Sequence, residues 1–139
     1  FKLEDKIQFY VAHQRTNQND SSKNIIEEVI ATDWLASDSS LLTKLDIKQM
    51  RFTNLYILYS DIVDAISIYN ISSVLPTNGN ITGAEARELS AKIEDIEQRI
   101  ANLRSKLKKE PQFNRKMELN IEIKRLEQNK NKLLGGYRL

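Results

Sequence analysis

The feature that most constrains the fold is a run of apolar residues that recurs at alternating intervals of four and three between residues 89 and 107. This spacing is the heptad signature of helices that pack along a narrow apolar seam. The run consists of Leu89, Ile93, Ile96, Ile100, Leu103 and Leu107. A second run obeys the same rule and consists of Leu119, Ile123, Leu126 and Leu133, with Lys130 as its one polar member. The C-terminal third is therefore predicted to be helical.

The two runs do not share one register, which predicts a break between them. Extending the first register leads to Glu110, Asn114, Met117, Ile121 and Lys124, which is not an apolar stripe. Pro111 lies at the break and disfavours helical geometry at the residue before it. We therefore predict two helices, over residues 84–109 and 114–134, that fold into an antiparallel coiled-coil hairpin. One continuous kinked helix that dimerises is the alternative.

The N-terminal part of the chain has the pattern of an antiparallel β-hairpin. Residues 6–13 alternate between apolar and polar positions, and residues 24–32 are again β-branched. The intervening residues 15–24 contain no apolar side chain and are predicted to form a loop. Residues 1–3 are predicted to be a strand end that turns into the next strand at residues 4–5. Trp34 is predicted to lie in the core.

Residues 55–69 are the most apolar stretch and predict a buried central helix. Its narrow polar face contains the carboxylates of Asp61 and Asp64. The sequence shows no third ligand beside them, which disfavours a metal site there. Upstream, Asp46 has the pattern of a helix N-cap, with Gln49 three residues later. The fold class predicted from all these elements is α+β, with an antiparallel sheet portion, a buried helix and a helical hairpin.

Composition divides the chain into three parts. Residues 1–75 are predicted to be an α+β portion, and residues 76–83, which contain Pro76 and Gly79, a linker. Residues 84–139 are predicted to form the helical hairpin, with Thr82 and Glu85 as a capping box at its start. We expect the α+β portion to be the C-terminal part of a larger domain.

Several classes of site are excluded or disfavoured by composition. The chain has no cysteine and only His13 as histidine, which excludes thiolate and multi-histidine metal centres. Its four glycines form no phosphate-binding motif, and no catalytic motif is recognisable, so neither a cofactor nor an enzyme activity is predicted. No apolar run approaches the roughly 20 residues that cross a bilayer. We expect a cytoplasmic protein without membrane contact.

Charge is distributed unevenly. Residues 1–83 carry 7 Lys and Arg against 10 Asp and Glu, whereas residues 84–139 carry 14 against 9. A basic cluster surrounds the predicted tip of the hairpin and is a hypothetical site for nucleic acid or another anion. The residues of this site are Arg104, Lys106, Lys108, Lys109, Arg115 and Lys116. Phe113, at the tip, and Lys130, in the seam, are hypothetical contacts for a protein partner.

The stretch from Lys108 to Asn120 resembles the closing motif of a bacterial family known as domain of unknown function 4391. Three further segments are similar to that family in the same order, namely residues 12–15, residues 32–35 and residues 54–56. The resemblance implies an uncharacterised protein with a further α/β portion upstream. It also implies a genetic neighbourhood of helicases and DNA methyltransferases of restriction or phage-defence type.

Three functions remain open. The first is a non-catalytic interaction module that engages a protein partner or a second copy through the coiled-coil hairpin. The second is a nucleic-acid-binding accessory subunit of a restriction or phage-defence system, which would use the basic tip. The third is a fragment of an enzyme whose active site lies in a missing N-terminal part.

Overall fold

The computed structural model describes residues 1–75 and 80–137, and its contacts divide the chain into two compact units. The first unit comprises Phe1–Asn70 and the second Ile71–Leu139. The predicted α+β class is confirmed, because short antiparallel strands precede helices that include a packed hairpin. The linker residues Pro76 and Gly79 lie outside the described residues.

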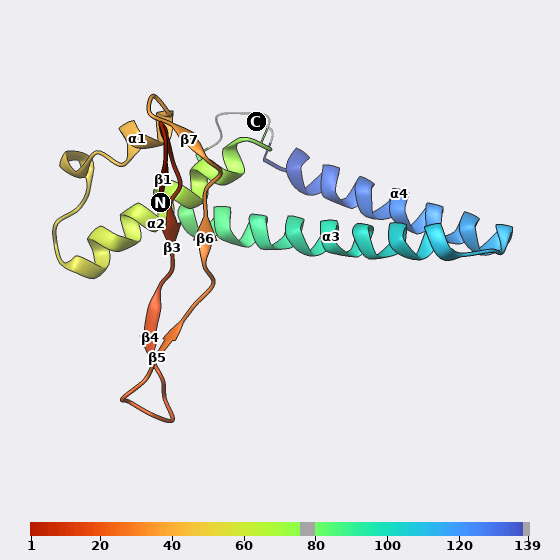
Figure 1. Ribbon diagram of the computed structural model, residues 1–139, viewed down its shortest axis with the longest axis horizontal. Coiled ribbons are helices and arrows are strands. Elements are labelled where there is room, and N and C mark those ends of the chain that lie inside the picture. Colours follow the sequence, from red (N-terminus) through yellow and green to blue (C-terminus); the bar gives the residue numbers. More distant parts are fainter. Residues whose placement is uncertain (76–79, 138–139) are drawn as a thin grey trace. The chain divides into compact units, whose positions relative to one another are not determined.

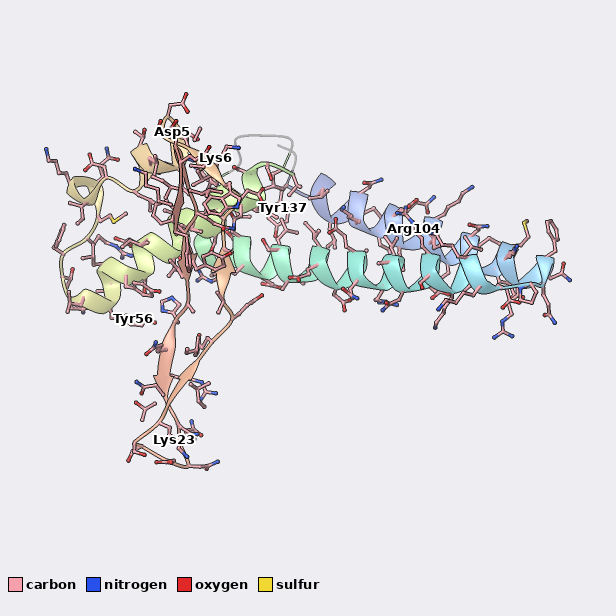
Figure 2. The ribbon with its side chains drawn as sticks, viewed as in Figure 1. Asp5, Lys6, Lys23, Tyr56, Arg104 and Tyr137 are labelled. Atoms are coloured by element: carbon pink, nitrogen blue, oxygen red, sulfur yellow. The ribbon has the colours of Figure 1, made fainter. Side chains whose placement is uncertain are left out.

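The strands of the first unit form one two-stranded arm with a third strand at its base (Figure 1). The base is a sheet in the order β1 (Lys2–Leu3), β2 (Lys6–Ile7) and β7 (Leu35–Ala36). Further along the arm, β3 (Tyr10–Val11) pairs with β6 (Ile30–Ala31), and β4 (Gln14–Thr16) pairs with β5 (Asn24–Ile26). All pairings are antiparallel, as predicted, and Lys23 lies in the loop at the far end (Figure 2).

The arm is interrupted twice, because the returning strand carries one extra residue at each interruption. Two residues separate β2 from β3, but three separate β6 from β7. Such an insertion changes which side chains face inward. Thr32 is buried and its Oγ1 accepts a hydrogen bond of 3.1 Å from the backbone N–H of Phe9, while the next buried residue is Leu35. The prediction that Trp34 lies in the core is therefore wrong: it falls in the inserted stretch and is 44% exposed.

The core of the first unit lies between the arm and α2 (Leu55–Ser72). Its buried members are Val11, Leu35, Leu41, Val63 and Ile66. Leu41 comes from α1 (Ser40–Lys44), a helix that the sequence did not predict. Asp46 does cap a helix, but only the short 3-10 helix η1 (Ile47–Gln49).

The second unit contains the predicted hairpin, so the continuous kinked helix is excluded (Figure 1). The helix α3 (Gly83–Lys109) begins with the predicted capping box, in which the Oγ1 of Thr82 accepts from the N–H of Glu85 at 3.2 Å. A carboxylate oxygen of Glu85 accepts in return from the N–H of Thr82 at 2.9 Å. The helix α4 (Phe113–Gly135) follows after residues 110–112 and runs back along α3.

The apolar seam joins the two helices as the spacing predicts. Ile96 and Ile100 of α3 pack with Ile123 and Leu126 of α4, and all four are at most 9% exposed. Partly buried leucines extend this cluster in both directions, namely Leu103, Leu107 and Leu133. Packing of this kind gives the hairpin most of its stability, since isolated helices of this length are marginal in water.

Candidate protein-interaction surface of the helical hairpin

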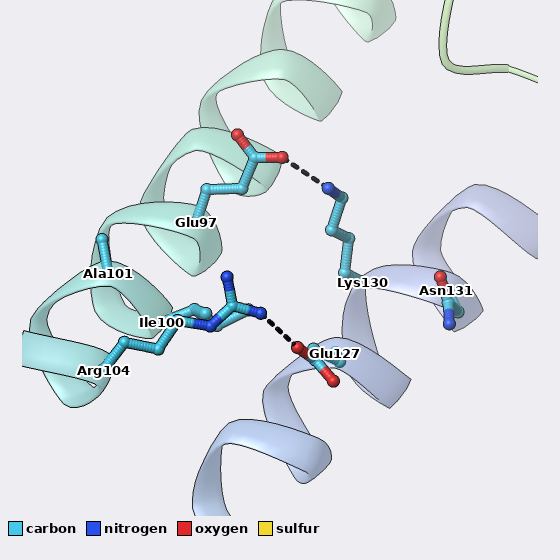
Figure 3. Close-up of a pocket in the computed structure, with 7 residues that line it drawn as sticks. All are labelled: Glu97, Ile100, Ala101, Arg104, Glu127, Lys130 and Asn131. Carbon is cyan, nitrogen blue, oxygen red and sulfur yellow. Dashed lines mark hydrogen bonds and ion pairs between the residues drawn. The ribbon is translucent and has the colours of Figure 1, made fainter. Parts of the chain in front are cut away.

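Two ion pairs cross between the helices beside the seam (Figure 3). The ammonium of Lys130 donates to a carboxylate oxygen of Glu97, and a guanidinium nitrogen of Arg104 donates to Glu127 at 2.8 Å. Lys130 therefore occupies a seam position with its side chain 27% exposed and its charge paired inside the hairpin. Figure 3 shows both pairs at the rim of a shallow groove of about 490 Å³.

This groove offers little to a small ligand. Its charged lining residues are the same four that form the two ion pairs, and its apolar floor is limited to Ile100 and Ala101. A ligand would have to break a cross-helix pair to reach a charge. We therefore assign the four residues to holding the helices in register.

The six cations of the predicted basic site are not equivalent. Arg104 is engaged with Glu127, and Arg115 lies 3.7 Å from a carboxylate oxygen of Glu110. The other four are exposed and have no ion-pair partner among the described residues, namely Lys106, Lys108, Lys109 and Lys116. Arg104 lies on α3, five residues before the helix ends at Lys109.

These four lysines are also not all on one face. Each residue of a helix is rotated by about 100° from the previous one, so Lys106 and Lys108 point to opposite sides of α3. Lys109 is three residues from Lys106 and lies about 60° from it, so these two lysines are neighbours on one side of α3. The tip thus presents dispersed positive charge, and it lacks the flat row of cations that would follow a phosphate backbone.

The most distinctive surface of the hairpin is an apolar stripe on α4 formed by Phe113, Met117 and Ile121, here called the outer stripe. These side chains are 73%, 50% and 63% exposed. Their spacing of four residues places them on one face of the helix, and that face is turned away from the seam residues Ile123 and Leu126. The hairpin packs without them, so their apolar area is available to a partner.

Phe113 was predictable from the sequence as a contact residue, but the rest of the outer stripe was not predicted. Met117 and Ile121 fall in the extended register of the first helix, and that register is interrupted by Glu110, Asn114 and Lys124. The missing signal was the interval of four from Phe113, which defines a second apolar face on a helix that already has one.

Other candidate groups in the first unit are accounted for by structural contacts. Asp61 accepts a hydrogen bond of 2.9 Å from the backbone N–H of Arg51 and also binds its guanidinium. These contacts lower the pKa of the Asp61 carboxyl. His13 packs against the rings of both Tyr56 and Tyr59. Within residues 1–75 and 80–137, no cluster of three side chains could hold a metal ion.

Comparison with known proteins gives one match. The sequence model of a family described as Domain of unknown function (DUF4391) matches residues 1–129. No curated protein and no solved structure matches the chain. Among the described residues, no helix combines the length and the apolar character needed to span a membrane.

Proposed function

Because the chain belongs to the DUF4391 family, whose description assigns no activity, we propose its function from its own geometry. We propose that it is a non-catalytic interaction module that binds a protein partner through its coiled-coil hairpin. The observation that supports this proposal is the outer stripe of Phe113, Met117 and Ile121, which is exposed although the seam of the hairpin is complete.

An apolar stripe on a solvated helix needs a reason, because exposing it lowers solubility without stabilising the fold. The corresponding outward face of α3 shows what a purely structural helix carries. At the same distance from its seam lie Ala91, Gln98, Asn102 and Ser105, all of them exposed and none of them large and apolar. The difference between the two helices is what favours α4 as the binding helix.

The proposal is tested by photo-crosslinking in cells that naturally produce the protein. A benzophenone amino acid replaces Asn120, which lies beside the outer stripe, and in a matched control it replaces Gln98 on α3. A protein that crosslinks from position 120 is expected, and it should disappear when Phe113, Met117 and Ile121 are all changed to Ala. The proposal would be contradicted by equal crosslinking from positions 120 and 98, or by crosslinking from position 120 that persists in the alanine variant.

A nucleic-acid-binding accessory subunit of a restriction or phage-defence system is the second candidate. Four lysines near the tip without ion-pair partners among the described residues favour it. The test is a mobility shift at two salt concentrations with the charge-reversed variant Lys108→Glu/Lys109→Glu/Lys116→Glu. This candidate predicts binding that weakens with salt and is lost in the variant, because each phosphate contact releases about one counterion.

A further inference from the structure

We propose that the outer stripe binds an acidic amphipathic helix of the partner protein, laid along α4. This inference rests on the proposed function and adds the chemistry of the partner. It follows from the spacing of the apolar side chains and from the charge of the residues that surround them.

The apolar spacing fits a helical occupant. Phe113, Met117 and Ile121 are spaced by about one helical turn and together cover about 12 Å of the α4 surface. A partner helix with apolar residues at intervals of three and four can place one side chain between each pair of these anchors. An extended strand would instead need backbone hydrogen-bond partners, and within a helix the backbone groups are already paired.

The charge of the residues beside the outer stripe determines which charge the partner helix should carry at its flanking positions. The helical repeat places Asn114, Glu118, Asn120, Lys124 and Arg125 next to the stripe, so that two cations lie beside one acid. Lys116 and Lys109 add positive charge toward the tip. Both are exposed and without an ion-pair partner among the described residues. Carboxylates flanking the apolar face of a partner helix would therefore meet more cations than acids beside the stripe, with Glu118 opposed by Lys116, Lys124 and Arg125.

The same charges disfavour a second copy of the chain as the occupant. Two outer stripes brought face to face would also bring together Lys124 and the lysines of both tips. Like charges across an interface cost binding energy. A single-stranded nucleic acid is also a poor fit, since its bases stack on aromatic rings and two of the three anchors are aliphatic.

The test measures fluorescence anisotropy of two labelled synthetic helices with the full chain. Both probes are about 18 residues long and carry Leu at intervals of three and four. One has Glu at the flanking positions and its twin has Lys. We expect the acidic probe to bind at least about tenfold more tightly than its basic twin.

Three variants locate the binding. When all three outer-stripe residues are changed to Ala, the affinity for the acidic probe is expected to fall about tenfold or more. Lys116→Glu/Lys124→Glu should reduce its affinity similarly and improve that of the basic probe. The control Gln98→Ser/Asn102→Ser on α3 should bind as the parent does. Circular dichroism of each variant verifies that the helices remain folded.

Several results would overturn the inference. These are equal affinity for both probes, unchanged binding by the alanine variant, displacement of the acidic probe by single-stranded DNA at similar affinity, and self-association through the outer stripe in sedimentation. The crosslinking experiment separates this failure from that of the proposed function. If crosslinks depend on the outer stripe but the acidic probe is not preferred, only the proposed partner chemistry is rejected. If neither the stripe-dependent crosslinks nor the preference for the acidic probe is observed, both proposals are rejected.

Discussion

Replacing Lys130 with Leu is expected to stabilise the hairpin, although it removes an ion pair. Lys130 occupies a seam position between Leu126 and Leu133, where the heptad pattern calls for an apolar side chain. Its ammonium reaches out of the seam to Glu97, whose side chain is 56% exposed. After the substitution Glu97 can therefore be solvated by water, and no buried charge is left behind.

The expected gain follows from the burial at this position. A leucine buried in the seam contributes about 2 kcal/mol relative to an exposed one, and the aliphatic stem of Lys130 already supplies roughly half of this. The lost ion pair is partly exposed and is worth about 0.5 kcal/mol. We expect the free energy of unfolding to rise by about 0.5 kcal/mol, and the midpoint of thermal unfolding to rise by about 1–2 °C.

The assay is urea and thermal unfolding followed by circular dichroism at the helical band, with Lys130→Ala as the control. The alanine variant loses both the stem and the ion pair and should be less stable by about 1 kcal/mol. The advantage of Lys130→Leu should grow at high salt, which weakens the parent's ion pair. If Lys130→Leu is as destabilised as Lys130→Ala, the reasoning is refuted. The ion pair would then contribute more to stability than an apolar side chain in the seam. Sedimentation of the leucine variant also tests whether Lys130 limits the number of associating helices.

Three further predictions concern packing, capping and a strand contact. Ile100→Ala should lower the free energy of unfolding by about 3 kcal/mol in urea denaturation, because it leaves a cavity in the seam; a loss below about 1 kcal/mol would mean that the seam is not close-packed. Thr82→Ala should cost about 1 kcal/mol through the lost cap. Because hydrogen bonds from Thr82 lower the pKa of Glu85, the contribution of Glu85 is present at neutral pH and is lost as pH falls through that lowered pKa. The gap in unfolding free energy between Glu85→Gln and the parent should therefore close in acid, and a gap independent of pH would contradict the cap. Tyr59→Phe should cost about 1–2 kcal/mol in chemical denaturation, since the Tyr59 hydroxyl accepts from the N–H of Ala12 at 3.0 Å and donates to its carbonyl at 2.8 Å.

The hairpin was predictable because its determinants are local in sequence. The mismatch of the two apolar registers and the position of Pro111 together exclude one straight helix, and the capping box is complete within four residues. The ends of both helices agree with the prediction to within a residue. Which charges meet across the seam was not predictable, because the pairing of Arg104 with Glu127 depends on the offset of the antiparallel helices.

The first unit was harder to predict because its details depend on long-range register. Alternation within residues 24–36 cannot reveal where the returning strand carries an extra residue, and that residue decides whether Trp34 faces inward. The start of α2 has an N-cap in Asn54, whose Oδ1 accepts from the N–H of Ile57 at 2.9 Å, but not the two-residue capping box that marks the start of α3. The first residues of α2, Leu55 and Tyr56, are exposed, although their apolar character predicted burial.

The short connection at residues 110–112 has a consequence for how the hairpin can vary. With only three residues between Lys109 and Phe113, neither helix can slide along the other without breaking the connection. An insertion in one helix alone would rotate every side chain beyond it away from the seam residue that it faces on the other helix. The hairpin can therefore lengthen or shorten only by matched steps of about one heptad in both helices. The length of the hairpin should therefore change only in whole steps. Relatives with longer or shorter hairpins should differ by the same number of heptads in each helix.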